Sequence, residues 1–144
     1  MPTPLRRGGR WLAGGLLLGC SLAVAGGELE AKVQAAFLFN FTKFVEWPGD
    51  ADAPLTLCVS GAENLGRLLA EVVSRPSKGR ALKVEVGRPA EPSRCQVLYI
   101  GAESPRVGEL LEGCRDAPVL TVSDLPDFVR QGGIIGFFFA GQPG

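Results

Sequence analysis

Hydrophobic and polar residues follow a helical period between residues 28 and 46. At about 100° per residue, the charged and polar side chains fall on one side of a helix, with Gln34 as the exception, and most of the large apolar side chains fall on the other. We therefore predict an amphipathic helix whose apolar side packs into the core. That side consists of Val33, Phe37, Leu38, Phe41, Phe44 and Val45.

Two aromatic residues of this segment depart from a simple core role. Phe39 falls on the polar side, near Lys43 and Glu46, and we expect it to point outward. Trp47 precedes Pro48, which disfavours helical geometry in the residue before it, so the helix should end here. We expect Phe39, Lys43, Glu46 and Trp47 to form a surface patch.

Short apolar runs alternate with further helical patterns along the rest of the chain. The predicted strands are 55–61, 81–86, 95–101, 117–123 and 134–140, and the predicted helices are 63–73, 105–112 and 124–131. Strands that alternate with helices indicate a mostly parallel sheet covered by helices on both faces. The sequence thus predicts a single α/β domain, Rossmann-like or flavodoxin-like, over residues 26–144.

Residues 1–25 have the pattern of a secretory signal peptide. Three arginines precede an uncharged apolar run, 11–25, which ends in the small-residue site Ala23-Val24-Ala25. An uncleaved anchor is the alternative, although the run is short for a membrane span. The segment Leu17–Cys20 also resembles a lipobox, in which Cys20 would be lipidated. Either way, we expect the remaining domain to lie outside the cytoplasm, in the periplasm.

Charge and composition exclude several functions. Removing the three arginines of residues 1–25 leaves 12 basic residues against 15 acidic ones, which argues against nucleic-acid binding. The sequence contains no histidine, so histidine-based catalysis and the commonest metal ligand are both absent. The turn 60–67 is neither a P-loop nor a dinucleotide-binding motif. We therefore expect no catalytic residue, no metal and no cofactor.

Two cysteines fall on strands that would be neighbours in a doubly wound sheet. Adjacent strands lie about 4.8 Å apart, so a disulfide between Cys58 and Cys95 is within reach if the register allows it. The alternative is a pair of buried free thiols. Cys114 then has no partner, and we expect it to be exposed at a helix end, where it is either incidental or an intermolecular link.

Several segments together resemble the YfiR/HmsC-like family of periplasmic regulatory proteins. They are VQAAFLFNFTKFVEWP, LTLCVSG, CQVLYIG, PVLTVSD and FVRQGGIIGFFF, and they extend from about Ala31 to Phe139. The resemblance implies a non-enzymatic protein that represses a membrane-bound diguanylate cyclase by contact with its periplasmic sensing domain. It thereby controls cyclic-di-GMP and biofilm formation. The resemblance also implies a disulfide at the positions of Cys58 and Cys95.

The end of the chain departs from the family pattern. Relatives continue with another strand and a final helix, whereas this sequence stops at FFFAGQPG. We expect the C-terminal strand and helix to be missing, through a fragment or a frameshift, unless the apolar edge strand pairs with another chain. A homodimer is therefore an open alternative.

Within this resemblance, the patch Phe39, Lys43, Glu46 and Trp47 is the predicted partner-binding surface, and the disulfide is a hypothetical redox gate. The alternative function is a periplasmic receptor for a small molecule or nucleotide. Its site would lie at the carboxyl ends of the strands, near Gly61, Gly101 and Ser123.

Overall fold

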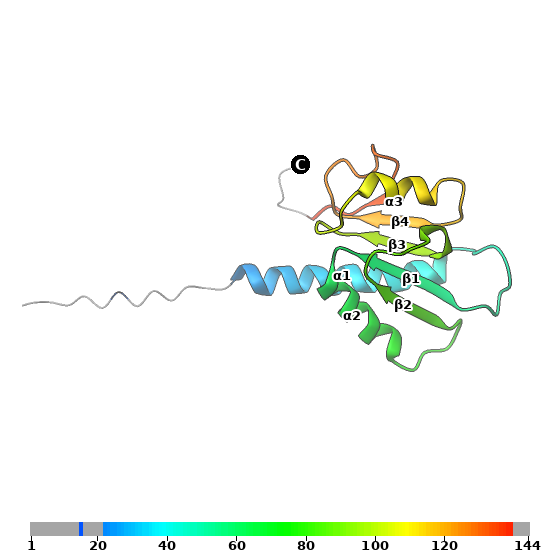
Figure 1. Cartoon of the computed structure of the whole chain (residues 1–144). Coiled ribbons are helices and arrows are strands. Elements are labelled where there is room, and N and C mark those ends of the chain that lie inside the picture. Colours follow the sequence, from blue (N-terminus) through cyan, green and yellow to red (C-terminus); the bar gives the residue numbers. More distant parts are fainter. Residues whose placement is uncertain (1–14, 16–21, 140–144) are drawn as a thin grey trace, which may run out of the picture.

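A five-stranded parallel sheet forms the centre of the protein (Figure 1). The computed structural model describes residue 15 and residues 22–139. The strand order is β2-β1-β3-β4-β5, and every neighbouring pair is parallel. The strands are β1 Leu55–Ser60, β2 Leu82–Val86, β3 Val97–Ile100, β4 Leu120–Ser123 and β5 Ile135–Gly136. The predicted single α/β domain with a doubly wound parallel sheet is confirmed.

Helices cover both faces of this sheet. Helix α1 (Leu22–Phe44) and helix α2 (Glu63–Ser74) pack against one another and against one face. Helix α3 (Val107–Cys114) and the short 3-10 helix η1 (Pro92–Arg94) lie on the opposite face. The connection between β2 and β3 thus carries only η1 where many α/β folds place a full helix.

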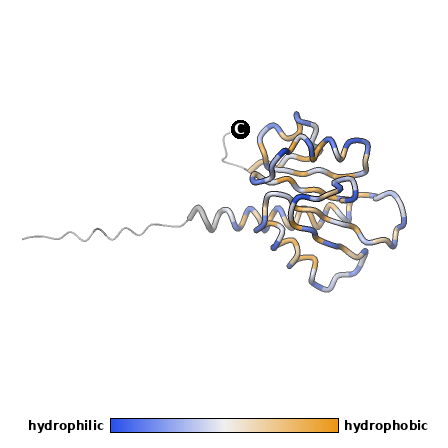
Figure 2. The backbone as a smooth tube through the Cα atoms, in the orientation of Figure 1, coloured by the Kyte–Doolittle hydropathy of each residue, from blue (hydrophilic) through white to orange (hydrophobic). Residues whose placement is uncertain are grey.

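Alternation along the strands divides the core into two layers. On β1, Leu57 and Val59 face α1 and α2, while Cys58 faces α3. Likewise, Tyr99 of β3 faces α1 and Leu98 faces α3. Because both faces are covered, β1 and β3 are apolar along almost their whole length, and Figure 2 shows this hydrophobic centre with hydrophilic residues in the surrounding turns.

Two predicted helices differ from the structure. Residues 124–131 form successive turns instead of a helix, because Pro126 restricts the residue before it and Asp127 adopts a left-handed φ of 59°. Helix α3 starts at Val107 and continues through Cys114, later than predicted. Ser104 does not cap it; its hydroxyl instead forms a buried 2.8 Å hydrogen bond with that of Ser60.

The predicted signal peptide falls mostly outside the described residues. Cys20 and its proposed lipidation belong to that part. Helix α1 begins at Leu22, six residues before the predicted start of the helix. In the described part of the chain, no helix combines the length and apolar character needed to cross a membrane.

Candidate functional site

Small and medium-sized residues attach α1 to the rest of the domain. The buried side of the helix consists of Ala31, Gln34, Ala35, Leu38 and Thr42. Short side chains at a helix contact allow close approach of the backbones, so the alanines seat α1 against α2 and the sheet. Of the large aromatic side chains of the helix, Phe39 and Phe41 pack half-buried against the same core.

The side of α1 predicted to be core is therefore mostly exposed. Phe44 is 82% exposed, Phe37 49% and Val33 39%, while Phe41 is half-buried. Spacings of four, four and three residues place these side chains along one line of the helix. We call Val33, Phe37, Phe41 and Phe44 the α1 stripe. The prediction that this side packs into the core is correct for Leu38, partly correct for Phe41 and wrong for the others.

Phe137, just after β5, joins the α1 stripe to the sheet. Its ring centroid lies 5.8 Å from that of Phe37, 6.4 Å from that of Phe41 and 6.4 Å from that of Tyr99. Aromatic rings at these separations are in favourable contact. The stripe therefore continues from the helix to the residue that follows β5, as one apolar surface.

β5 is the last strand at this edge of the sheet, and among the residues that the structure describes no further strand pairs with its outer side. Phe137 donates its N–H to the carbonyl of Ser123 on β4 at 2.8 Å. Because successive residues of a strand point their backbone groups in opposite directions, the N–H and C=O of Gly136 face away from β4. The regular strand is shorter than the predicted 134–140, since pairing with β4 covers only Ile135 and Gly136.

The four residues predicted to form a patch lie at the end of α1, but two of them are anchored. Phe39 is half-buried and packs against the core, so the prediction that it points outward is wrong. The Lys43 ammonium lies 4.3 Å from the centroid of the Phe39 ring. Trp47 is also half-buried, and its indole N–H donates to the carbonyl of Thr42 at 3.2 Å. Glu46 is exposed.

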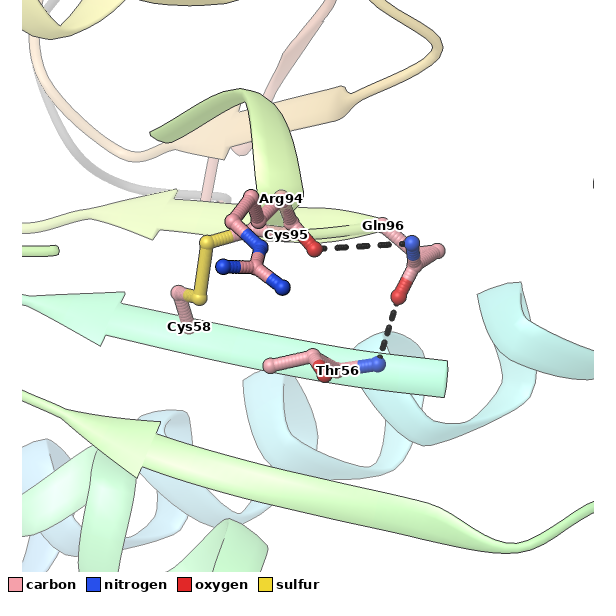
Figure 3. The surroundings of a disulfide bond; sticks show 5 residues. All are labelled: Thr56, Cys58, Arg94, Cys95 and Gln96. Atoms are coloured by element: carbon pink, nitrogen blue, oxygen red, sulfur yellow. Dashed lines mark hydrogen bonds between the residues drawn. A yellow bond between two sulfur atoms is a disulfide. The ribbon is translucent and has the colours of Figure 1, made fainter. Parts of the chain in front are cut away.

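Cys58 of β1 and Cys95, which directly follows η1, form a disulfide. Cys58 and Cys95 are joined, with Cα atoms 5.9 Å apart, and both side chains are buried (Figure 3). In the ladder between β1 and β3, Leu57 lies opposite Val97, so Cys58 and Cys95 are not direct partners across the two strands. The bond closes because η1, which ends at Arg94, lies on the α3 face of the sheet and places the next residue, Cys95, beside Cys58. The predicted pairing is confirmed, although Cys95 precedes β3 instead of beginning it.

A glutamine side chain fixes the backbone beside this disulfide. The amide oxygen of Gln96 accepts a 2.6 Å hydrogen bond from the N–H of Thr56, and its nitrogen donates to the carbonyl of Arg94 (Figure 3). The side chain therefore links the start of β1 to the end of η1. This holds the two cysteine-bearing segments together independently of the sulfur bond.

Cys114 is a free and buried thiol. The expectation that it is exposed is wrong, since only 8% of it is accessible. Its environment, formed by α3 and residues such as Val119, is apolar. Burial raises the pKa of the Cys114 thiol, which makes it a poor nucleophile.

The carboxyl ends of β1, β3 and β4 frame an open cavity of about 520 Å³. Gly61 and Gly101 line it as the receptor alternative predicted, but Ser123 does not. The Ser123 hydroxyl is buried and bonded to the carbonyl of Ile100 and the N–H of Leu125. The next residue, Asp124, lines the cavity instead.

Two buried polar side chains reach this cavity from different elements. Gln34 of α1 is 6% exposed, and its amide nitrogen donates to Asp124 Oδ2 at 3.4 Å. Tyr99 of β3 is 2% exposed; burial, reinforced by the negative charge of Asp124, raises the pKa of its hydroxyl, which stays protonated. Sequence reasoning overlooked both residues. The one signal was Gln34, a polar residue within an apolar helix segment.

Comparison with known proteins places this arrangement in a family. The profile of the YfiR/HmsC-like family matches residues 31–143, which is more than half of the chain. A search of curated proteins finds no match. The matched range contains the α1 stripe, the whole sheet and both cysteines of the disulfide. On this match, the chain belongs to the YfiR/HmsC-like family.

Proposed function

We propose that the protein is a periplasmic regulator that represses a membrane-bound diguanylate cyclase by contact with the periplasmic sensing domain of that enzyme. Family membership supports a regulatory role through binding instead of catalysis. Release of the cyclase would raise cyclic-di-GMP and promote biofilm formation. The observation that carries the proposal is the α1 stripe, because an exposed apolar surface of this kind needs a partner.

The size of the stripe suits the centre of a protein interface. At about 200 Å² per phenylalanine, the exposed fractions of Phe44 and Phe37 leave roughly 260 Å² of aromatic surface in water. Val33 and the half-buried Phe41 and Phe137 extend it. Apolar patches of about 300–600 Å² are the largest that monomeric proteins usually expose, and they are often functional.

The patch Phe39, Lys43, Glu46 and Trp47 would flank this centre. Lys43 and Glu46 place one charge of each sign at the end of α1, and both are exposed. Charged residues at the rim of an interface set orientation and association rate more than affinity. In this arrangement the stripe supplies binding energy and the predicted patch supplies specificity.

The experiment is co-purification of the protein with the periplasmic domain of each diguanylate cyclase of the source organism. Phe44→Asp should lower the affinity by at least tenfold, because it places a charge where about 2 kcal/mol of apolar burial would occur. The melting temperature should stay unchanged, since Phe44 is exposed. Val129→Asp, at another exposed apolar residue outside the stripe, is the matched control and should leave binding intact.

A negative result would be equally clear. If no cyclase domain binds, and deletion of the gene leaves cellular cyclic-di-GMP unchanged, the proposed function is wrong. If binding occurs but survives Phe44→Asp, the partner contacts another surface. Leu38→Ala, at a fully buried residue, shows in the same assay what loss of folding looks like.

Redox gating is the finer part of the proposal. The disulfide lies on the α3 face, whereas the stripe lies on the α1 side, so reduction would act by loosening β1 and the sheet beneath α1. A Cys58→Ala/Cys95→Ala variant should then bind the cyclase domain more weakly than the oxidised protein. Equal affinity of the two proteins would exclude the gate without affecting the contact itself.

A further inference from the structure

The two edges of the sheet differ in how well they are protected. β2, at one edge, presents the exposed charged residues Lys83 and Glu85. Charged side chains on an edge strand oppose pairing with a strand of another chain. β5, at the other edge, lies within residues 131–139, which contain no charged residue. The β5 edge therefore lacks the protection that the β2 edge has.

The backbone of β5 offers a donor and an acceptor at this edge. Phe137 directs its N–H to β4, so the N–H and C=O of the preceding residue, Gly136, point away from β4. Within residues 22–139, no strand pairs with these two groups. In an antiparallel pair, two residues that lie directly opposite one another can exchange both hydrogen bonds. A second copy of β5, placed antiparallel with its own Gly136 opposite, would satisfy both groups on each chain.

This register brings together the most exposed apolar side chains near β5. Ile135 and Phe137 pack into the core below α1, so alternation places Ile134 and Phe138 on the α3 face of the sheet. Ile134 is 56% exposed and Phe138 is 86% exposed. With Gly136 opposite Gly136, Ile134 of each copy lies directly across from Phe138 of the other copy. Aromatic and β-branched residues form favourable cross-strand pairs, so two such contacts would flank the centre.

The apolar area around β5 is sufficient for a small dimer interface. At about 200 Å² per phenylalanine, the exposed fractions of Phe138 and Phe37 amount to roughly 270 Å² per copy. Ile134 and Val129, each just over half exposed, add about 100 Å². About 65% of a homodimer interface is apolar, so two copies would bury roughly 1,100 Å² in total. This area is slightly above the roughly 1,000 Å² that a specific interface needs.

We propose that the protein forms a homodimer in which the β5 strands of two copies pair antiparallel, with Gly136 at the twofold axis. Such a pair uses the same patch on both copies, so the assembly closes at two. The twofold axis is perpendicular to the joined sheet, and both α1 stripes therefore lie on the same face of it. Phe37 is common to this interface and the α1 stripe. The test uses the purified protein by itself, so its outcome is independent of the proposed cyclase contact.

Sedimentation velocity of the purified protein, from about 5 to about 500 µM, measures the association. We expect a monomer–dimer equilibrium with a Kd of about 100 µM or tighter. Phe138→Lys should weaken the dimer at least tenfold, because it places a charge beside the opposite strand, and it should leave the melting temperature unchanged because Phe138 is exposed. Val86→Lys, at an exposed apolar residue of the other edge strand, is the matched control and should dimerise like the wild type.

Three outcomes of this experiment would overturn the proposal. They are a protein that stays monomeric over the whole range, a protein that assembles beyond the dimer, and a dimer that Phe138→Lys leaves as tight as the wild type. The last outcome would place the contact on another surface.

A cross-link tests the position of the twofold axis. Gly136→Cys is made together with Cys114→Ala, which removes the free thiol of α3. A Cβ at Gly136 meets no atom closer than 3.5 Å, so the new side chain fits. Directly opposite residues of a hydrogen-bonded pair have Cα atoms about 5.5 Å apart, which is within the range of a disulfide. Mild oxidation should therefore give a covalent dimer on a non-reducing gel. Val86→Cys in the same background should stay monomeric, and equal cross-linking by the two variants, or none by Gly136→Cys, would refute the pairing.

Discussion

Removal of the Cys58–Cys95 disulfide should lower the free energy of unfolding by about 4 kcal/mol. The two cysteines are 37 residues apart, and the chain-entropy relation for a loop of this length gives roughly 3.8 kcal/mol at 25 °C. The suitable change is Cys58→Ala together with Cys95→Ala. Serine would be a poorer choice, because both positions are almost fully buried and a serine hydroxyl there would need a new partner.

Thermal and urea unfolding, followed by circular dichroism, measure this change. For a domain of this size, 1 kcal/mol corresponds to about 4 °C, so the melting temperature should fall by roughly 15 °C. The wild-type protein in reducing agent should unfold like the double variant. Cys114→Ala removes a sulfur from α3 without breaking a cross-link and serves as the control, with a smaller loss that reflects packing alone.

The outcome that contradicts this reasoning is a small effect. A loss below about 1 kcal/mol in the double variant would mean that the cross-link restricts the unfolded chain far less than the entropy relation requires. An equal loss in Cys114→Ala would mean that sulfur packing, not loop closure, carries the stability. In that case the Gln96 hydrogen bonds to Thr56 and Arg94 would be the main link between β1 and η1.

Two further predictions concern buried positions. Iodoacetamide should label Cys114 slowly in the folded protein at pH 8, because this thiol is buried and burial raises its pKa, and it should label Cys114 quickly in urea. Mass spectrometry of the peptide that contains Cys114 measures both rates. Fast labelling of the native protein would contradict the burial of this thiol. Gly101→Ala should destabilise the domain by about 1–3 kcal/mol, because the new methyl would clash with the backbone of Gly61. The control is Gly108→Ala in α3, where the new methyl meets open space and the change should be neutral or stabilising by up to about 1 kcal/mol. Urea unfolding compares the free energies of unfolding of the two variants. Equal effects would show that the turns at Gly61 and Gly101 are not in tight contact.

The sequence predicts most of the fold because the strands are apolar runs of the right length. Buried parallel strands such as β1 and β3 leave a nearly continuous hydrophobic signal, and the intervening helices set their order. The error over 124–131 has a local cause. A helical pattern continues through this segment, yet Asp127 takes a left-handed conformation that no hydrophobic pattern reveals.

The hydrophobic pattern of the sequence could not predict which side of α1 faces the core. Apolar residues lie on two sides of this helix, with Ala31, Ala35 and Leu38 on one and the α1 stripe on the other. Hydrophobic periodicity favours the larger side chains, whereas packing selected the smaller ones. For a related reason, the sequence predicted only some of the residues that line the cavity. Gly61 and Gly101 follow strands and could be named in advance, but Gln34 and Tyr99 meet Asp124 only after the chain has folded.

The exposed phenylalanines separate binding from folding in this domain. A side chain that remains in water in the folded state contributes little to stability, since its surroundings are similar before and after folding. Phe44 is such a side chain, and covering it would release about 2 kcal/mol that folding has left unused. The contact of α1 with α2 and the sheet through Ala31, Ala35 and Leu38 makes this possible, because it holds the helix without the side chain of Phe44. Substitutions at the exposed end of the stripe, such as those of Phe44, can therefore change what the protein binds while leaving its core, its disulfide and the cavity near Asp124 intact.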